Sequence, residues 1–212
     1  MKRNSFINAA LYLIVVFILM SCRGSSGRQD FNEDKARADW HMTDELNSRH
    51  EPGPAEEMVF RQAAHDGNLE QVKTFLNQGG NFNAIDQGGQ TALMFAAFNG
   101  HSEIVLLLIE AGAEIDQRDN TGRTALLYGS TGPFPETVKI LLDRGADPNL
   151  VDSDEHFSPL MHAAAEGQLE VVKVLLAHGA DPGLKDVDGD DAASFASQSG
   201  HQQVVAYLNE IK

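Results

Sequence analysis

The chain has 212 residues, of which 31 are acidic, 16 are basic and 42% are hydrophobic. The hydrophobic share is large enough to bury a core, so the composition excludes a wholly disordered chain. The net charge of −15 argues against a nucleic acid partner, because the phosphate backbone rewards clustered Lys and Arg side chains. The same charge would be repelled by anionic lipid headgroups.

The amino-terminal segment has the layout of an export signal. A basic start precedes an almost unbroken apolar run from Phe6 to Met20, which is too short for a membrane span. Residues 19–22 read Leu-Met-Ser-Cys and resemble the lipobox of bacterial lipoproteins. The resemblance implies that the Cys22 sulfur carries a diacylglycerol and that residues 1–21 are removed. An uncleaved anchor and ordinary signal cleavage are the alternatives.

Cys22 is the only cysteine, so no disulfide can form within the chain. Residues 1–21 contain two basic residues and no acidic one, so cleavage would leave 14 basic and 31 acidic residues and a net charge of −17. Two or more acyl chains anchor a protein stably. The resemblance therefore implies a lipid-anchored protein of the bacterial cell envelope. Arg23, in place of an inner-membrane retention Asp, favours the outer membrane, with the protein facing the periplasm.

Residues 22–56 are expected to form the acylated cysteine and a flexible tether. The segment combines Gly, Ser, Asn and mixed charge, and it ends in Pro-Gly-Pro at residues 52–54. As a coil it would span on the order of 30 Å. Trp40, with Met42 and Leu46, could instead form a short amphipathic helix that docks on the domain or on a partner. A solvated tether is the favoured interpretation.

From Glu57 onward the sequence repeats itself with a period of 33 or 34 residues. The period is set by glycines that begin Gly-Gly or Gly-Ala pairs: Gly79, Gly112, Gly145 and Gly179. Each unit predicts a helix, a turn, a second helix and an extended hairpin. Because helices of eight to ten residues are marginal alone in water, the units must stack. The predicted units are 57–90, 91–123, 124–157, 158–190 and 191–212.

Two units carry a specific family resemblance. The second unit reads Thr-Ala-Leu-Met-Phe-Ala-Ala-Phe-Asn-Gly-His from Thr91 and Glu-Ile-Val-Leu-Leu-Leu-Ile-Glu-Ala-Gly-Ala from Glu103. The fourth unit opens with Ser-Pro-Leu-Met-His-Ala-Ala-Ala-Glu-Gly from Ser158. These segments resemble the ankyrin repeat family, over about residues 57–212. The resemblance implies an all-α repeat solenoid of about five stacked helix-turn-helix units, caps included, with connecting β-hairpin loops.

The third unit departs from its neighbours. It has Gly129-Ser130 where they read Ala-Ala, and Thr-Gly-Pro-Phe-Pro follows at residues 131–135. Residues before proline avoid the helical region, so the first helix of this unit should end by about Thr131. Phe134 either plugs the resulting gap, which is the favoured interpretation, or borders a notch shaped for a partner.

A stacked repeat has no natural catalytic pocket, and its usual role is to present an extended concave face to another protein. Aromatic and Arg side chains dominate binding energy at interfaces, which favours Phe98, Arg118, Arg123 and Phe157. Phe98 and Phe157 could equally be packed inside. The partner-binding residues implied by the resemblance are Phe98, Asn99, Arg118, Asn120, Arg123, Phe157, Glu166 and Lys185.

Neither a metal, a cofactor nor a catalytic site is expected. Residues 186–190 begin like a calcium loop, but Asp191 stands where the turn needs glycine and Ser197 where a bidentate glutamate is expected. The histidines lack the spacing of a helical zinc site, and no nucleophile or phosphate-loop motif occurs.

We therefore predict a monomeric binding module for a protein partner. The acidic residues near the carboxyl-terminal end would attract a basic partner, and a solvated acidic face is the default interpretation. A structural spacer in the envelope is the second hypothesis, and an enzyme is the least favoured.

Overall fold

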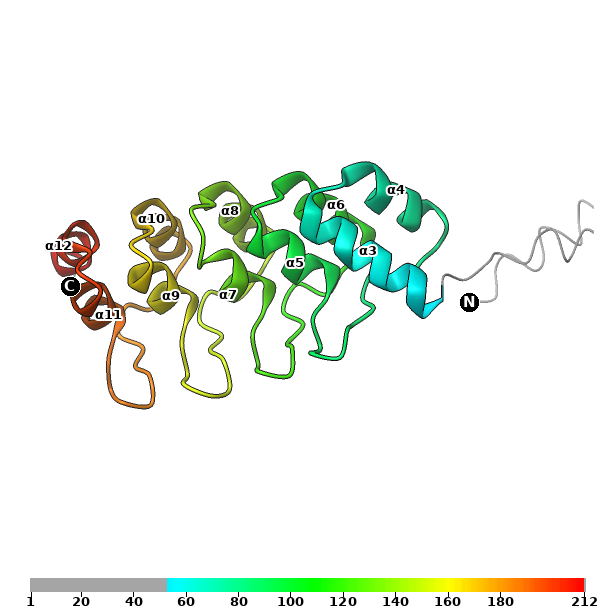
Figure 1. Cartoon of the computed structure of the whole chain (residues 1–212). Coiled ribbons are helices and arrows are strands. Elements are labelled where there is room, and N and C mark those ends of the chain that lie inside the picture. Colours follow the sequence, from blue (N-terminus) through cyan, green and yellow to red (C-terminus); the bar gives the residue numbers. More distant parts are fainter. Residues whose placement is uncertain (1–52, 212) are drawn as a thin grey trace, which may run out of the picture. The chain divides into compact units, whose positions relative to one another are not determined.

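A computed structural model describes residues 53–211, and in this range the chain forms helices joined by turns and loops. The predicted signal peptide, Cys22 and the tether up to residue 52 lie outside the described residues. Figure 1 shows helical hairpins standing side by side, with long loops projecting together from one edge of the helical layers. The all-α repeat solenoid expected from the sequence is confirmed.

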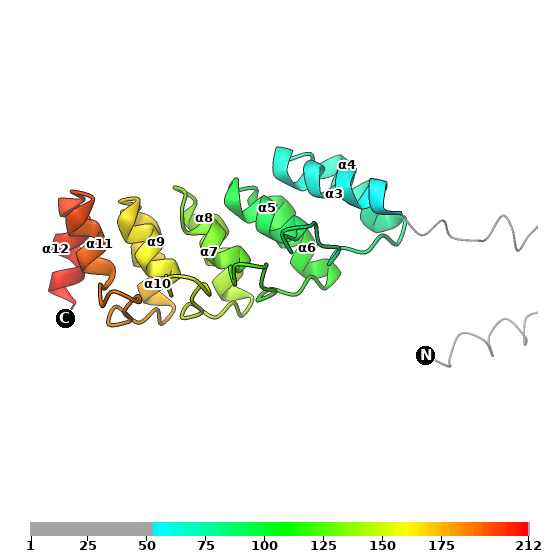
Figure 2. The same cartoon turned by 60° about the horizontal axis from the view of Figure 1, so that its bottom comes forward.

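The helices of the described range come in five consecutive pairs. Their bounds are α3 (Pro54–Asp66) and α4 (Leu69–Asn77), α5 (Ala92–Phe98) and α6 (Ser102–Ala111), α7 (Ala125–Gly129) and α8 (Pro135–Asp143), α9 (Pro159–Ala165) and α10 (Leu169–Ala177), and α11 (Ala192–Gln198) and α12 (Gln202–Glu210). The first helices of the pairs pack on one another in chain order, and the second helices form a parallel outer layer. Figure 2 shows the same succession of pairs from another side.

The stack begins at Pro54, three residues earlier than Glu57. Proline stands at the first helical position, where it loses no intrahelical hydrogen bond, and Gly53 is the N-cap residue. The Glu56 carboxylate accepts a hydrogen bond from the Gly53 amide at 2.7 Å. Residues 53–56, which the sequence analysis placed in the tether, thus form the cap and first turn of α3.

Four of the first helices begin with the same cap. A side-chain oxygen accepts a hydrogen bond from the backbone N–H three residues later, at 2.9–3.4 Å. The four capping residues are Thr91, Thr124, Ser158 and Asp191. Because these residues recur at the repeat spacing, the same local chemistry starts each helix at the same place in its unit.

The core is continuous through the stack. Leu93, Leu126 and Leu160 occupy one position of successive first helices, and all three are at most 1% exposed. The second helices bury a corresponding column, formed by Leu108, Leu141, Leu175 and Leu208. All seven leucines belong to one buried cluster that runs through the units, so helices too short to be stable alone are stabilised by their neighbours.

The projecting loops are hairpin-like turns, and no strand occurs within residues 53–211. One backbone hydrogen bond closes each loop, as between the Asp86 N–H and the Gln90 carbonyl at 3.1 Å. A second kind of bond joins neighbouring loops: the Asn120 N–H donates to the Gly88 carbonyl at 2.9 Å, and the Ser153 N–H to the Thr121 carbonyl at 2.8 Å. The Val187 and Glu155 backbones make the third such link at 3.1 Å. The loop tips are therefore held as one edge.

Side chains reinforce the same interfaces at the base of the loops. Asn83 accepts a hydrogen bond from the Glu114 N–H at 3.1 Å, and Asn149 accepts one from the Asp181 N–H at 2.8 Å. Asp116 occupies the equivalent position between them and accepts from the Asp147 N–H at 3.3 Å. Burial raises the pKa of the Asp116 carboxyl, and although the Asp147 amide opposes this, the Asp147 charge adds to it.

Phe134 fills the gap in the third unit. Helix α7 has five residues where α5 and α9 have seven, in agreement with the expected shortening. The Phe134 ring lies against Gly100, where an added Cβ would come within 2.2 Å of it. His101 and His201 lie in the same way over the turn glycines of the units before them. Phe134 therefore packs as these histidines do, which supports the plug over the notch.

Candidate protein-binding surface

The first helices and the loops together line one side of the stack, which we call the groove face. One aromatic side chain from each of α5, α7, α9 and α11 stands at an equivalent position along it, 33 or 34 residues apart. This aromatic column consists of Phe95, Tyr128, His162 and Phe195. All four side chains are partly exposed. The column offers flat apolar surface to a ligand along the length of the groove face.

Two residues that precede an N-cap, Gln90 and Phe157, contact members of the aromatic column. The Gln90 amide donates to the Tyr128 hydroxyl oxygen at 2.6 Å. The Phe157 ring meets the His162 and Phe195 rings edge to face, with centroids 5.6 and 5.0 Å apart. Loops and helices are thereby locked together, so the groove face is preorganised for binding.

Asp119 is a buried polar residue beside Tyr128, with 8% of its surface exposed. Its carboxylate accepts hydrogen bonds from the Tyr128 hydroxyl at 2.7 Å, from Thr121 and from the Arg123 N–H. Burial by itself would raise the pKa of Asp119, but the hydrogen bonds outweigh it and hold that pKa below its usual value. Burial, with the bond to Asp119, raises the pKa of Tyr128. The Asp119 carboxylate therefore makes its hydrogen bonds within the fold and not with a ligand.

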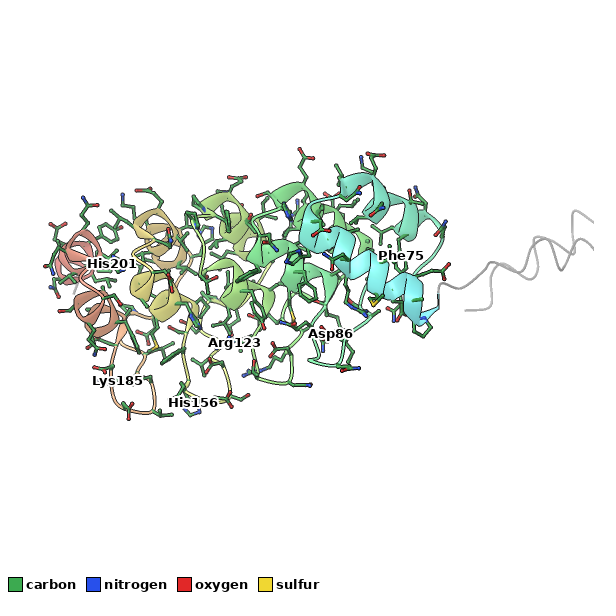
Figure 3. All side chains as sticks on the ribbon, in the orientation of Figure 1. Phe75, Asp86, Arg123, His156, Lys185 and His201 are labelled. Carbon is green, nitrogen blue, oxygen red and sulfur yellow. The ribbon has the colours of Figure 1, made fainter. Side chains whose placement is uncertain are left out.

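A second polar group lies further along, around His162. Burial, with a smaller contribution from the Arg123 charge, lowers the pKa of His162 to about 4, although Asp152 opposes the shift. The His162 Nε2 and the Arg123 Nε are buried and have no hydrogen-bond partner among the described residues. Arg123 Nε lies 3.6 Å from the Asp152 carboxylate, which is 2% exposed. Figure 3 labels Arg123 near the base of the loops, whereas Asp86, His156 and Lys185 mark the loops themselves.

The amino-terminal end of the groove face contains a hollow of about 680 Å³. Two of its walls are exposed aliphatic side chains, Met58 at 62% and Ile85 at 53%. We call it the amino-terminal hollow; its lining residues are Pro54, Met58, Arg61, Gln62, His65, Ile85, Asp86, Gln87 and Phe95.

A smaller hollow of about 190 Å³ lies next to the first. The two share His65 and Phe95, whose rings meet edge to face at 6.0 Å. The smaller hollow also includes Phe98, which is 47% exposed and packs edge to face on Tyr128 at 6.1 Å. The two hollows together form an elongated depression across the first three units, which we call the apolar depression after Met58, Ile85 and Phe98, although Arg61, Gln62, Asp86 and Gln87 also line it.

The predicted binding residues separate into two groups. Phe98 is exposed in this depression, and Glu166 is exposed at the end of α9. Lys185 is also exposed, although its ammonium group donates to the Gly189 carbonyl at 2.7 Å. These three side chains remain reachable by a partner.

The others make contacts within the fold, although Arg118 and Asn120 also stay exposed. The Arg118 guanidinium donates to the Val151 carbonyl, and the Asn120 amide donates to the Gln87 carbonyl at 3.0 Å. Asn99 donates to the Phe95 carbonyl at 3.1 Å. Arg123 and Phe157 are partly buried beside His162. For Phe157, packing inside is the alternative that the structure favours.

Sequence reasoning overlooked most of the amino-terminal hollow. Met58, His65 and Ile85 were not selected, because the first unit lacks the threonine start by which the other units were aligned. The recurrence of Phe95, Tyr128, His162 and Phe195 at the repeat spacing was visible, and it would have indicated the column.

The comparisons with known proteins agree with this architecture. A family model described as ankyrin repeats, in three copies, matches residues 60–152 and 131–211. The chain belongs to the ankyrin repeat family. A comparison with curated proteins yields no match. Ankyrin repeats suggest a protein–protein interaction module, as the exposed groove face does.

In residues 53–211, no helix has the length and apolarity that crossing a membrane requires. Across the same range, no three His, Cys, Asp or Glu side chains are grouped so that they could hold a metal ion. Asp186, in the segment that resembles a calcium loop, accepts hydrogen bonds from the Asp188 and Asp190 amides, as its place in a repeat loop requires.

Proposed function

We propose that this protein is a lipid-anchored binding module of the bacterial cell envelope, whose ankyrin groove face captures a protein partner. Cys22 would carry the lipid, residues beyond it would form the tether, and the stack would bind. The anchor rests on the Leu-Met-Ser-Cys sequence at residues 19–22 and on the absence of any other cysteine. The outer membrane, with the stack in the periplasm, is the expected location.

The observation that carries the binding function is the apolar depression of the first three units. Met58, Ile85 and Phe98 expose roughly half of their surface or more there, and they are three of the six exposed large hydrophobic side chains among residues 53–211. Exposed apolar surface that forms a contiguous depression marks an interaction site. The backbone hydrogen bonds between neighbouring loops and the Gln90–Tyr128 hydrogen bond fix this surface before binding, which reduces the entropy cost of binding.

Binding is tested by comparing variants of the full chain in intact envelopes. A Phe98→Ala, Ile85→Ser double variant should lose at least about 2 kcal/mol of partner affinity, since exposed aromatic anchors in a depression carry such energies. Lys73→Ala is the matched control, because Lys73 is an exposed side chain of α4 on the outer layer. Co-purified proteins that decrease in the double variant and not in Lys73→Ala support the proposal. Equal recovery from both would contradict it.

The anchor is tested separately on Cys22. Mass spectrometry of the mature protein should find an acylated cysteine as the first residue, and Cys22→Ala should release the chain from the membrane fraction. An intact Met1 or a cleavage site elsewhere would contradict the lipid anchor while leaving the binding function standing.

A further inference from the structure

We propose that the amino-terminal hollow binds an acidic, amphipathic peptide segment of the partner, with apolar side chains in the hollow and a carboxylate on Arg61. This inference rests on the proposed binding function and specifies the chemistry of its ligand. It differs from the basic partner that the overall charge suggested.

The walls of the hollow require apolar side chains. Met58 from α3 and Ile85 from the first loop line the hollow, and Phe95 and His65 lie where it adjoins the smaller hollow. At about 680 Å³ the amino-terminal hollow lies within the range of pockets that enclose a ligand, and the adjoining space makes it elongated. An extended segment with two or more apolar side chains fits this shape better than one compact group.

Arg61 is the guanidinium group that lines the hollow, together with one carboxylate, Asp86. Its Nη1 is buried and has no hydrogen-bond partner among the described residues. A buried donor without an acceptor destabilises the free protein, and a ligand that supplies an acceptor removes this cost. Carboxylates suit guanidinium groups especially well, because the two can form paired, charge-assisted hydrogen bonds.

The acidic groups around the hollow are already engaged. The Asp86 carboxylate accepts hydrogen bonds from the Gly88 and Gln90 amides, both at 2.8 Å. Asp66 accepts from Gln62 and from the His65 ring, also at 2.8 Å. Both carboxylates thus already accept hydrogen bonds, whereas the Arg61 Nη1 has no acceptor among the described residues, and its preference is for an anion.

The acidic carboxyl-terminal loops do not offset this preference. Asp181 and Asp186 hold their own turns by accepting the Gly183 and Asp190 amides, and Asp190 accepts from Gln198. These carboxylates keep their charge, but they lie at the far end of the stack from Arg61, where salt screens them from the hollow.

The test uses two labelled peptides of equal apolar content, Gly-Glu-Leu-Glu-Phe-Glu-Leu-Gly and its counterpart with Lys for Glu. They are titrated by fluorescence anisotropy with the full chain in about 0.15 M salt, which screens the distant acidic residues of the chain. The acidic peptide should bind about tenfold more tightly, the difference expected when one charged pair worth about 1.4 kcal/mol is gained. Equal binding, tighter binding of the Lys peptide, or no binding of either would overturn the proposal.

Variants locate the site. Ile85→Ser should weaken both peptides, whereas Val187→Ser, at a residue equally exposed at 53% on the last loop, should change neither. Arg61→Gln should weaken only the acidic peptide, and Arg144→Gln, whose ion pair with Glu110 lies on the outer layer, should leave it unchanged. Loss of acidic-peptide binding with Arg144→Gln as well would indicate general charge attraction and contradict the site.

Two other occupants give distinct results. Sedimentation that shows Ile85-dependent dimers would assign the hollow to a second copy of the chain. Trp40 is the only tryptophan, so acrylamide quenching reports on it alone. If Trp40 is shielded from acrylamide and Ile85→Ser abolishes the shielding, the hollow is occupied by the chain's own amino-terminal segment. Either result overturns the proposal. If envelope capture still depends on Phe98 while the peptides show no acidic preference, the proposed function stands and only the ligand chemistry fails.

Discussion

His162 makes the stability of the stack depend on pH in a way that one substitution should remove. Burial holds its pKa at about 4 in the folded chain, against 6.5 in the unfolded chain. The unfolded state therefore binds the proton first, so the stabilising contribution is complete above pH 6.5 and is lost as the pH falls toward 4. At about 1.4 kcal/mol per pH unit, the loss between pH 7.5 and pH 4.5 amounts to about 2.5 kcal/mol.

The substitution to make is His162→Phe, because Phe95 and Phe195 occupy the same position in other units. Urea unfolding followed by circular dichroism gives the free energy of unfolding at both pH values. Between pH 7.5 and pH 4.5, the free energy of unfolding should fall by about 2.5 kcal/mol less in the variant than in the parent chain. It should also be at least as stable at pH 7.5, since the unpaired Nε2 is gone. His162→Gln is the polar control and should share the weaker pH dependence. Equal losses in all three chains would refute the buried, neutral histidine.

Three further substitutions test particular contacts by the same unfolding measurement. Asp116→Asn should stabilise the chain at pH 7.5 by about 0.5 kcal/mol, because the amide keeps the acceptor without the partly buried charge, and the gain should vanish below the raised carboxyl pKa. A gain that persists in acid would contradict this cause. Gly100→Ala should destabilise by about 1–3 kcal/mol, since its φ is 72° and the Phe134 ring occupies the space of the methyl group; a neutral effect would argue against the plug. Tyr128→Phe should cost about 1 kcal/mol by removing the hydroxyl bond to Asp119, and no cost would show that the bond contributes nothing.

Much of the fold could be predicted because its determinants are local and repeated. Four helices are capped by the side chain of the residue before them, so one residue in the sequence predicts each helix start. These residues are Thr91, Thr124, Ser158 and Asp191. The shortened helix of the third unit followed from two prolines. The start of α3 was missed because Pro-Gly-Pro is equally typical of a linker and of a capped first turn.

The binding surface was harder to predict because it depends on which side chains are already bonded to, or buried by, the neighbouring units. Arg118 and Asn120 looked like free polar side chains in the sequence, yet both bond to carbonyls 33 residues away. Met58 and Ile85 gave no signal, since an aliphatic residue in a repeat is normally buried. Exposure of that kind follows only from the stacking of one unit on the next.

The most direct test of the central claim is photo-crosslinking in living cells. A photoreactive amino acid replaces Phe98 in the apolar depression or, in a matched strain, Lys73 on the outer layer. The account predicts a discrete crosslinked protein from position 98 that is absent from position 73 and decreases when Ile85 is changed to Ser. Crosslinks of the same kind and yield from both positions, or from neither, would contradict recognition through the groove face.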